Sequence, residues 1–303
     1  MQNIPQQQIY DPWEIKQEIT SFNIEIHCCR YWMLSEWECE NLSLPSWRIY
    51  HSRTGGSFVQ FGGQTHELTN DKLILIPPYT AFSSCIHQQY KKTERIKGIK
   101  ITRETEVAHY AEKGMSDQFF AHFNLGHPYD KISPGIYSCQ LNENWHREMR
   151  DIETERIANP NVISLYSSMK INGLLIFVLQ QLKPESWDLS IPDKRIARVL
   201  RYIDENINTE LQNSVLSDKA SMATNSFARL FRNLMQQTVQ QYIQQKRIEK
   251  AIKLLHYSTL GIEDIAAACG YYDRHHFSKV FKTQTGLSPV RYRKRISGEF
   301  LSD

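Results

Sequence analysis

The chain lacks the short motifs that mark the common enzyme classes. Its 303 residues contain no H-x-H, H-E-x-x-H, G-x-S-x-G or P-loop spacing. These spacings place the metal ligands, nucleophiles or phosphate-binding amides that such enzymes need. We therefore assign no catalytic residue and expect a protein that is not an enzyme. A metal-dependent barrel enzyme fused to another module is the alternative, which stoichiometric bound metal in the purified protein would favour.

Export and metal-binding signals are also missing. The six cysteines form no C-x-x-C pair. In a strand, the adjacent side chains of His27, Cys28 and Cys29 point to opposite faces, so we expect no metal ion and no cofactor. Met1–Gln8 is polar, unlike a secretory signal, and the most apolar stretch, Ile171–Leu182, is too short to cross a bilayer. We expect a soluble, cytoplasmic protein with reduced thiols.

Positive charge is scarce in the first two thirds of the chain and concentrated in the last third. Residues 194–303 hold 18 lysines and arginines against 10 aspartates and glutamates, whereas residues 1–193 hold 18 against 23. A basic C-terminal third joined to an acidic body indicates a polyanionic partner for one end only.

The N-terminal part is rich in predicted strands. Short runs of aromatic and aliphatic residues at Trp47–His51, Ser57–Phe61 and Leu73–Ile76 are separated by glycine, asparagine and proline pairs. Arg95–Thr102 alternates as a strand with one buried face would. Several short strands at this spacing predict a sandwich or a barrel.

Helical periodicity begins near Asn144. Trp145–Ala158 and Ile163–Leu182 are predicted helices that flank the strands, parted by Asn159-Pro160. The second has a broad apolar face, which consists of Ile171, Leu174, Leu175, Val178, Leu179 and Leu182. This face suits either a second copy of the chain or the chain's own strands. Residues 183–193 carry two prolines and no helical face, so we take them as a linker.

Everything after the linker is predicted to be helical. Ile196, Val199, Leu200 and Ile203 form one apolar stripe. Further helices are expected over Val215–Ala220, Asn225–Leu234, Val239–Tyr257, Ile262–Ala268, Arg274–Gln284 and Pro289–Ile296. We thus expect an α+β protein with a strand-rich N-terminal domain at 1–182 and an all-α domain at 194–298.

The C-terminal helices contain an internal repeat with an offset of 50 residues. The aligned pairs include Phe227 with Phe277, Phe231 with Phe281, Tyr242 with Tyr292, Val215 with Ile265, Arg229 with Lys279 and Arg232 with Lys282. The apolar pairs lie on one helix face and the basic pairs on others. We expect the four phenylalanines in the core and the basic residues outside it.

Each copy is predicted to be a short helix, a tight turn and a second helix, at about 215–234 and 262–284. In the second copy Gly270 suits a left-handed turn position and Asp273 suits a helix cap. Ala220 and Ala223 take these places in the first copy, so its turn is expected to be weaker. A duplicated helical hairpin that binds protein is the alternative, but the charge distribution favours two helix-turn-helix units that bind DNA.

The second copy carries a distinctive series of residues. It runs from Ile265-Ala266 through Gly270-Tyr271, Asp273, His276-Phe277-Ser278-Lys279 and Phe281-Lys282 to Gly286-Leu287-Ser288-Pro289 and Tyr292-Arg293. With it, residues 194–298 resemble the DNA-binding domain of the AraC/XylS family of bacterial regulators. The first copy fits less tightly and has Gln236 where the second has Gly286.

The resemblance implies two reading helices in successive major-groove segments, about 34 Å apart on one face of a duplex. The residues expected to meet base edges are Thr224, Asn225, Ala228, Arg229, Arg274, His275, Ser278 and Lys279. Arg232, Lys282 and Arg293 are expected to meet phosphates, which position a protein without reading sequence. The expected partners are double-stranded DNA and, for an activator, RNA polymerase.

For the N-terminal domain the resemblance implies a cupin-like β-barrel that senses a small molecule or mediates homodimer formation. Candidate pocket residues are Arg48, Tyr50, His51, Arg53, His66, Tyr79 and His87, each with a structural or surface role as the alternative. A sugar or another small polar metabolite is the effector that the family suggests. A ligand-independent regulator controlled by protein contacts, or a cupin enzyme fused to the DNA-binding module, are the alternatives.

Overall fold

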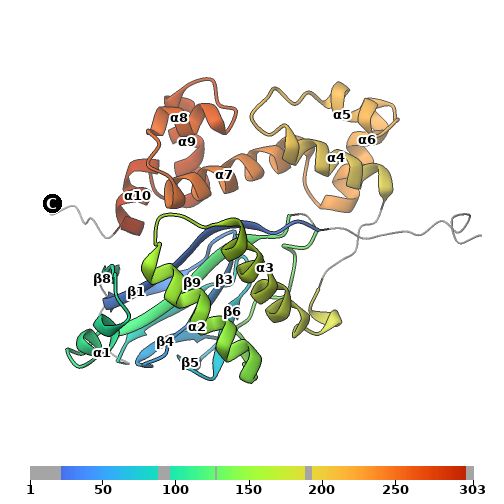
Figure 1. Ribbon diagram of the computed structural model, residues 1–303. Helices are drawn as coiled ribbons and strands as arrows, with labels where there is room; N and C mark the ends of the chain where they lie inside the picture. Colours follow the sequence, from blue (N-terminus) through green and yellow to red (C-terminus); the bar gives the residue numbers. More distant parts are fainter. Residues whose placement is uncertain (1–21, 88–95, 127, 188–192, 298–303) are drawn as a thin grey trace, which may run out of the picture.

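The computed structural model describes residues 22–87, 96–126, 128–187 and 193–297. They form an N-terminal part built on β-sheets, with a layer of C-terminal helices lying across one end of it (Figure 1). The predicted α+β class is confirmed. Met1–Gln8, Arg95 and residues 188–192 of the predicted linker lie outside the described residues.

The strands within these ranges form two antiparallel sheets. Their order is β10-β6-β3-β9-β1-β8 in the larger sheet and β2-β7-β4-β5 in the smaller. The bounds are β1 (Glu25–Trp37), β2 (Cys39–Leu42), β3 (Trp47–His51), β4 (Ser57–Phe61), β5 (Gln64–Leu68), β6 (Lys72–Ile76), β7 (Phe82–Ile86), β8 (Ile96–Ile99), β9 (Ser116–Asn124) and β10 (Tyr137–Gln140). Three of these, β3, β4 and β6, match the predicted strands closely.

Alternation along the strands gives the larger sheet two different faces. On β3, Trp47 and Ile49 belong to a core that the sheet shares with helices, whereas Tyr50 belongs to a core between the two sheets. On β9, Phe119 and Ala121 also face the helices. Because side chains alternate between faces, every second residue of β3 and β9 points toward the space between the sheets.

Three α-helices of the described N-terminal part accompany the sheets. They are α1 (Thr105–Ala111), α2 (Glu143–Ala158) and α3 (Leu165–Gln180). The apolar face of α3 packs on the chain's own larger sheet, since Ile171, Leu174, Leu175 and Val178 are fully buried there. This face is therefore used within the chain, which removes it as a candidate surface for a second copy.

Two expectations about the N-terminal part need correction. The predicted strand near Arg95–Thr102 exists as β8, but all of Ile96–Ile99 is exposed because β8 is an edge strand paired only with β1. Within the segment that was expected to bury one face, only Ile101 is fully buried, and it lies beyond the end of β8. In the predicted linker, Pro184–Ser186 form a 3-10 helix, and the Trp187 ring packs 5.6 Å from that of Trp47.

The C-terminal helices agree closely with the sequence prediction. They are α4 (Lys194–Glu205), α5 (Asn213–Lys219), α6 (Thr224–Met235), α7 (Val239–Tyr257), α8 (Ile262–Ala268), α9 (Arg274–Thr285) and α10 (Pro289–Ser297). Helix α7 begins at a capping box, in which the Thr238 hydroxyl accepts from Gln241 N and the Gln241 side chain accepts from Thr238 N. This long helix connects the two helix-turn-helix units.

The two turns differ by one residue, which corrects the alignment of the first helices. In the first turn Met222 N donates to Ser217 O, and in the second turn Tyr271 N donates to Ala266 O. These two bonds are equivalent, so the first helices of the two copies align with an offset of 49 residues and not 50. Leu216, fully buried, is the counterpart of Ile265, whereas Val215 is exposed. Ser221, with φ +53°, and not Ala220, takes the left-handed place of Gly270. The second turn has one additional residue, the fully exposed Tyr272.

Candidate nucleic-acid interface and adjoining cavity

An equivalent cluster of aromatic residues supports the second helix in each of the two units. Phe227 and Phe231 are fully buried, and Phe231 meets Tyr242 with ring centroids 5.7 Å apart. The equivalent residues Phe277 and Phe281 are also fully buried, and Phe281 meets Tyr292 at 5.4 Å. The prediction that these phenylalanines are core residues is confirmed. Burying this face of α6 and of α9 turns their other faces outward.

The caps of α6 and α9 differ as the sequence indicates. The Asp273 carboxylate accepts from the backbone N–H groups of His275 and His276, both at 2.8 Å, which satisfies two of the free donors at the start of α9. Ala223 makes no side-chain cap at the start of α6. At the other end, Gln236 adopts the left-handed conformation that Gly286 adopts in the second unit, with φ +55°. The first unit is therefore built with less local support.

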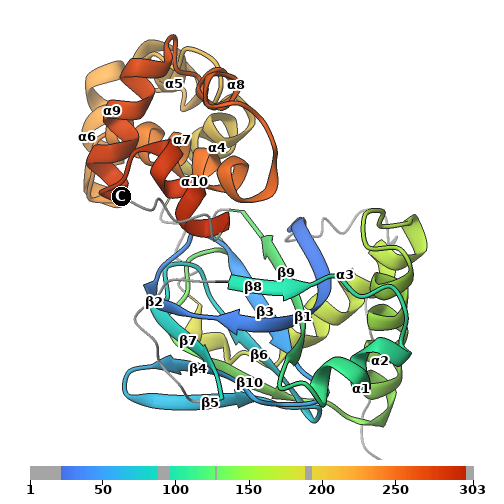
Figure 2. The same cartoon turned by 90° about the vertical axis from the view of Figure 1, so that its left-hand side faces the viewer.

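Both reading helices lie on one side of α7. In Figure 1 they stand at opposite ends of α7, and in Figure 2, viewed along the line between them, they overlap on the same side of it. Most residues expected to meet bases are exposed, namely Thr224, Asn225, Arg229, Arg274, His275 and Lys279, while Ala228 and Ser278 are half-buried. This arrangement leaves the first turns of α6 and α9 open to a partner on a shared exterior surface.

The residues expected to meet phosphates fall into two groups. Arg232 and Lys282 are exposed. Arg293 on α10 is half-buried, and its Nε and Nη2 atoms are buried without a hydrogen-bond partner among the described residues. Its guanidinium is therefore less open to a phosphate than those of the other two residues.

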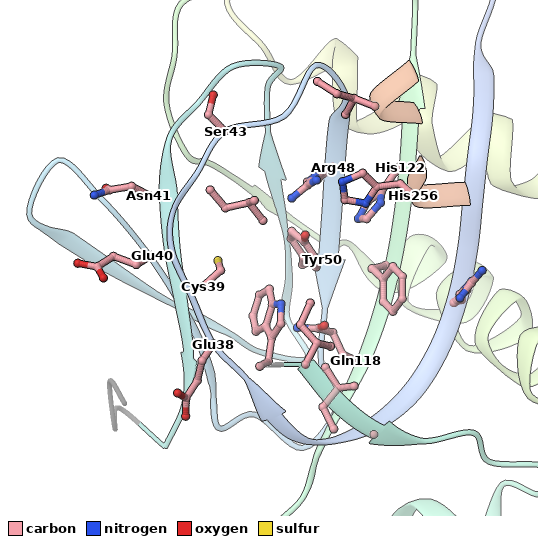
Figure 3. Close-up of a pocket in the computed structure, with 18 of the residues that line it drawn as sticks. Glu38, Cys39, Glu40, Asn41, Ser43, Arg48, Tyr50, Gln118, His122 and His256 are labelled. Carbon is pink, nitrogen blue, oxygen red and sulfur yellow. The ribbon is translucent and has the colours of Figure 1, made fainter. Parts of the chain in front are cut away.

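A cavity of about 570 Å³ lies between the sheets and the C-terminal helices. Arg48, Tyr50 and Phe120 line it from the larger sheet, and Ile252 and His256 line it from α7. Further walls come from Trp32, Leu34, Trp37, Gln284, Thr285 and Tyr292. The cavity is mainly apolar and takes its boundary from both halves of the chain (Figure 3).

Four nitrogen atoms that border this cavity are buried without a hydrogen-bond partner among the described residues. They are Arg48 Nε, Gln118 Nε2, His122 Nε2 and His256 Nε2. Arg48 and Gln118 are 3% and 1% exposed. Figure 3 shows Arg48, His122 and His256 grouped at one end of the cavity and Gln118 at the other. A buried polar atom without a partner is costly, so a ligand that supplies acceptors to Arg48 Nε and Gln118 Nε2, which can only donate, would be stabilised here.

Burial keeps the two histidines neutral. Desolvation, reinforced by the charge of Arg48, lowers the pKa of His122 well below its usual value and that of His256 to about 3. The positive charge at this end of the cavity therefore belongs to Arg48, whose guanidinium also lies 5.6 Å from the centre of the Phe82 ring. Sequence reasoning missed Gln118, His122 and His256 because no pattern joins β9 to the end of α7.

Among the seven predicted pocket residues, only Arg48 and Tyr50 line this cavity. His51 points to the opposite face of β3, where its Nδ1 lies 2.8 Å from Glu153 Oε1 on α2. Arg53 pairs with the same carboxylate. His87 Nε2 bonds the Gly114 carbonyl, and His66 lies half-buried on β5. Tyr79 lines a different cavity and bonds Glu249. Strand alternation and local partners thus hold His51, Arg53 and His87 away from this cavity.

Known proteins resemble the C-terminal part of the chain. A helix-turn-helix domain profile matches residues 216–295. The regulatory protein SoxS of Escherichia coli K12 is 34% identical over 103 residues, which are 34% of this chain and 96% of SoxS. The transcriptional regulator AlkR of Acinetobacter baylyi is 32% identical over 112 residues, so the match spans only 37% of AlkR. The crystal structure of the DNA-binding domain of AdpA in complex with a target DNA is 27% identical, and the match covers 33% of this chain and 91% of that chain, with a TM-score of 0.33.

The paired reading helices, the matching domain profile and the similarity to SoxS define a DNA-binding helix-turn-helix protein. The chain belongs to the AraC/XylS family of transcription regulators. It is a sequence-specific DNA-binding transcription regulator, and its partner is double-stranded DNA. In the described part of the chain, no helix is both long and apolar enough to span a membrane.

Proposed function

We propose that this regulator responds to a small molecule held in the cavity between the sheets and the C-terminal helices. The observation that carries the proposal is the set of four unpartnered buried nitrogen atoms around one apolar space. Arg48 supplies the charge, so the favoured effector combines an acceptor-rich, preferably anionic, group with an apolar body. A neutral sugar is the competing candidate.

Thermal unfolding of the full chain in the presence of small molecules tests this proposal. The probes are a panel of aliphatic and aromatic monocarboxylates and a matched panel of neutral sugars. A carboxylate that raises the melting temperature of the wild type but not of Arg48→Met supports the proposal. Stabilisation by a sugar alone would assign the effector to the other class. A regulator unaffected by either panel would fit control through protein contacts.

The DNA contacts follow from the position of the reading helices. We propose that Thr224, Asn225, Ala228, Arg229, Arg274, His275, Ser278 and Lys279 face bases, and that Arg232 and Lys282 face phosphates. The support is the position of these residues at or beyond the first turns of α6 and α9, where all of them except the half-buried Ala228 and Ser278 are exposed. Arg and Lys side chains can donate to guanine O6 and N7, and Asn can pair with adenine. We also propose Arg293 as a phosphate contact, although its half-buried guanidinium is less open than those of Arg232 and Lys282.

We propose a homodimer through the exposed start of α3. Val162, Leu165, Tyr166 and Met169 are 61–75% exposed there, which is unusual for large apolar side chains so close together. Nearby charges have both signs, because Lys170 pairs with Asp151 at 2.7 Å, so a second copy can meet this face about a two-fold axis without repulsion. Analytical ultracentrifugation of Leu165→Glu should give a monomer, and a wild-type monomer would refute the proposal.

The remaining proposals concern the domain boundaries, the location of the protein and its partners. We propose residues 194–298 as the DNA-binding domain and residues up to 182 as the sensing domain. We also propose that the protein acts in the cytoplasm, contacts RNA polymerase if it activates, and has no catalytic role.

A further inference from the structure

The two helix-turn-helix units pack on different parts of α7 and have separate cores. The first core includes Val239, Tyr242 and Ile243 from the beginning of α7. The second includes Ile248, Ala251 and Leu255 from further along the helix. No residue of the part that the structure describes belongs to both cores. Apart from the continuous helix α7, contacts outside these two cores are therefore needed to hold the two units at one angle to each other.

Arg247 lies on α7 between the last residue of the first core and the first residue of the second. Its Nε donates to the Ile207 carbonyl at 3.1 Å, and its Nη2 donates to the Thr209 carbonyl at 2.7 Å. Both carbonyls belong to the connection between α4 and α5. Arg247 thus satisfies two backbone acceptors of the first unit with one planar group.

The same guanidinium contacts the turn of the second unit. Its Cζ lies 5.7 Å from the centre of the Tyr271 ring. A Cβ placed on Gly270 would lie 2.9 Å from Arg247 Nη2 and 2.8 Å from Ile207 O. Gly270, with φ +76°, therefore allows the backbones of the two units to meet at the guanidinium. Arg247 is in contact with both units at a point where Gly270 of the second unit lies against the Ile207 carbonyl of the first.

We infer that Arg247 is a positioning residue that fixes the spacing and relative rotation of the two reading helices. It thereby determines which separation of two DNA segments the protein accepts, although it is half-buried on α7 and is assigned no DNA contact. One additional base pair moves a segment by about 3.4 Å and rotates it by roughly 35°. A rigid pair of readers rejects that change, whereas a hinged pair tolerates it.

Selection from a pool of random duplexes by the full-length chain tests the inference without a known operator. Wild type should enrich two sequence segments at a single separation, and Arg247→Met should enrich the same segments at several neighbouring separations. On duplexes re-spaced by one base pair, wild type should lose about tenfold or more in affinity, as for a lost base contact, and the variant clearly less. Lys250→Met is the matched control, because it removes a charge from the same helix one turn away, and it should behave as wild type.

Two further measurements keep the inference falsifiable. Arg247→Lys keeps the charge but cannot bridge both carbonyls, so it replaces Arg247→Met if that variant does not fold, and it should also broaden the separations. Without DNA, hydrogen exchange at residues 206–211 and 269–273 should become faster together in either variant. The inference is overturned if a folded variant retains one separation, if exchange in these two segments is unchanged, or if neither variant folds.

Discussion

His122 Nδ1 on β9 lies 2.8 Å from the hydroxyl of Tyr257 at the end of α7, in a hydrogen bond that spans 135 residues of sequence. The Tyr257 ring also stacks on His27 of β1, with centroids 5.3 Å apart. Lys253, one turn earlier on α7, pairs with Glu25 at 3.3 Å. Helix α7 therefore contacts the larger sheet through a small set of polar side chains as well as through the cavity wall.

Acidification should weaken this junction. Below about pH 6.5 the unfolded chain protonates its histidines, whereas burial keeps the pKa of His256 at about 3 and that of His122 well below 6.5. The unfolded or separated state then binds more protons, so stability that is present above pH 6.5 is lost as the pH falls. Between pH 6.5 and pH 5 the loss from His256 should be about 1–2 kcal/mol, and His122 should add a loss in the same direction.

Thermal melts of the full chain at pH 7 and pH 5 check this expectation. His256→Gln should reduce the difference between the two melting temperatures, because the substituted side chain does not titrate. His109→Gln, at an exposed position of α1, is the control and should leave the difference unchanged. Equal pH sensitivity in all three proteins would contradict the assignment.

Arg229→Ala and Lys279→Ala should each weaken binding to a selected duplex by about 1–3 kcal/mol, because each loses a donor to a base edge. Both side chains are exposed, so the melting temperature should not change. Mobility shifts at one fixed salt concentration give the affinities. Lys113→Ala removes an exposed charge from the N-terminal part and should bind as wild type. Normal affinity in both reading variants would remove these two assignments.

A fragment of residues 194–303 should fold and bind DNA alone, because its two cores contain no residue from the sheets. Binding should weaken steeply with salt, since phosphate contacts release counterions. Circular dichroism and mobility shifts over a salt series provide the measurements. An unfolded fragment would mean that the contacts of α7 with the sheets are required for the fold.

Asp117→Asn should destabilise the full chain by about 2–3 kcal/mol, because charge-assisted hydrogen bonds are lost. The buried carboxylate accepts from Ser52 Oγ, Arg53 N, Thr54 N and Tyr31 Oη at 2.7–2.9 Å. Burial opposes its ionisation, but these bonds and that from the Thr54 hydroxyl prevail and lower the pKa of Asp117. This stability is present above the ordinary aspartate range and is lost in acid.

Denaturant unfolding of Asp117→Asn and of Asp151→Asn provides the comparison. Asp151 is exposed and pairs with Lys170 on the surface, so its substitution should cost less than about 1 kcal/mol. Similar losses in the two variants would contradict the structural importance of the Asp117 network.

Much of the C-terminal half could be predicted from the sequence, because helical periodicity, caps and a repeat are local signals. Val239–Tyr257 and Ile262–Ala268 were bounded correctly by such signals alone. The one-residue difference between the turns was missed, because an ungapped offset of 50 pairs Val215 with Ile265 and hides the buried Leu216. The backbone hydrogen bonds of the two turns and the positive φ of Ser221 reveal it.

The cavity was not predictable beyond Arg48 and Tyr50, because it depends on contacts between distant segments. His51 and Arg53 look equally suited to a pocket in sequence, yet both pair with Glu153, about 100 residues away. His256 belongs to a helix that the sequence assigns only to DNA binding, and its place beside Arg48 arises from how α7 rests on the sheet. Local patterns carry no information on such packing.

The shared wall of the cavity has a thermodynamic consequence. Ile252 and His256 belong to the helix that connects the two readers, and they also border the space available to a metabolite. If a bound molecule changes the operator affinity by some factor, the operator must change the affinity for that molecule by the same factor. Titrating the metabolite with and without operator fragments would therefore show whether a bound metabolite strengthens or weakens the binding of the protein to its operator.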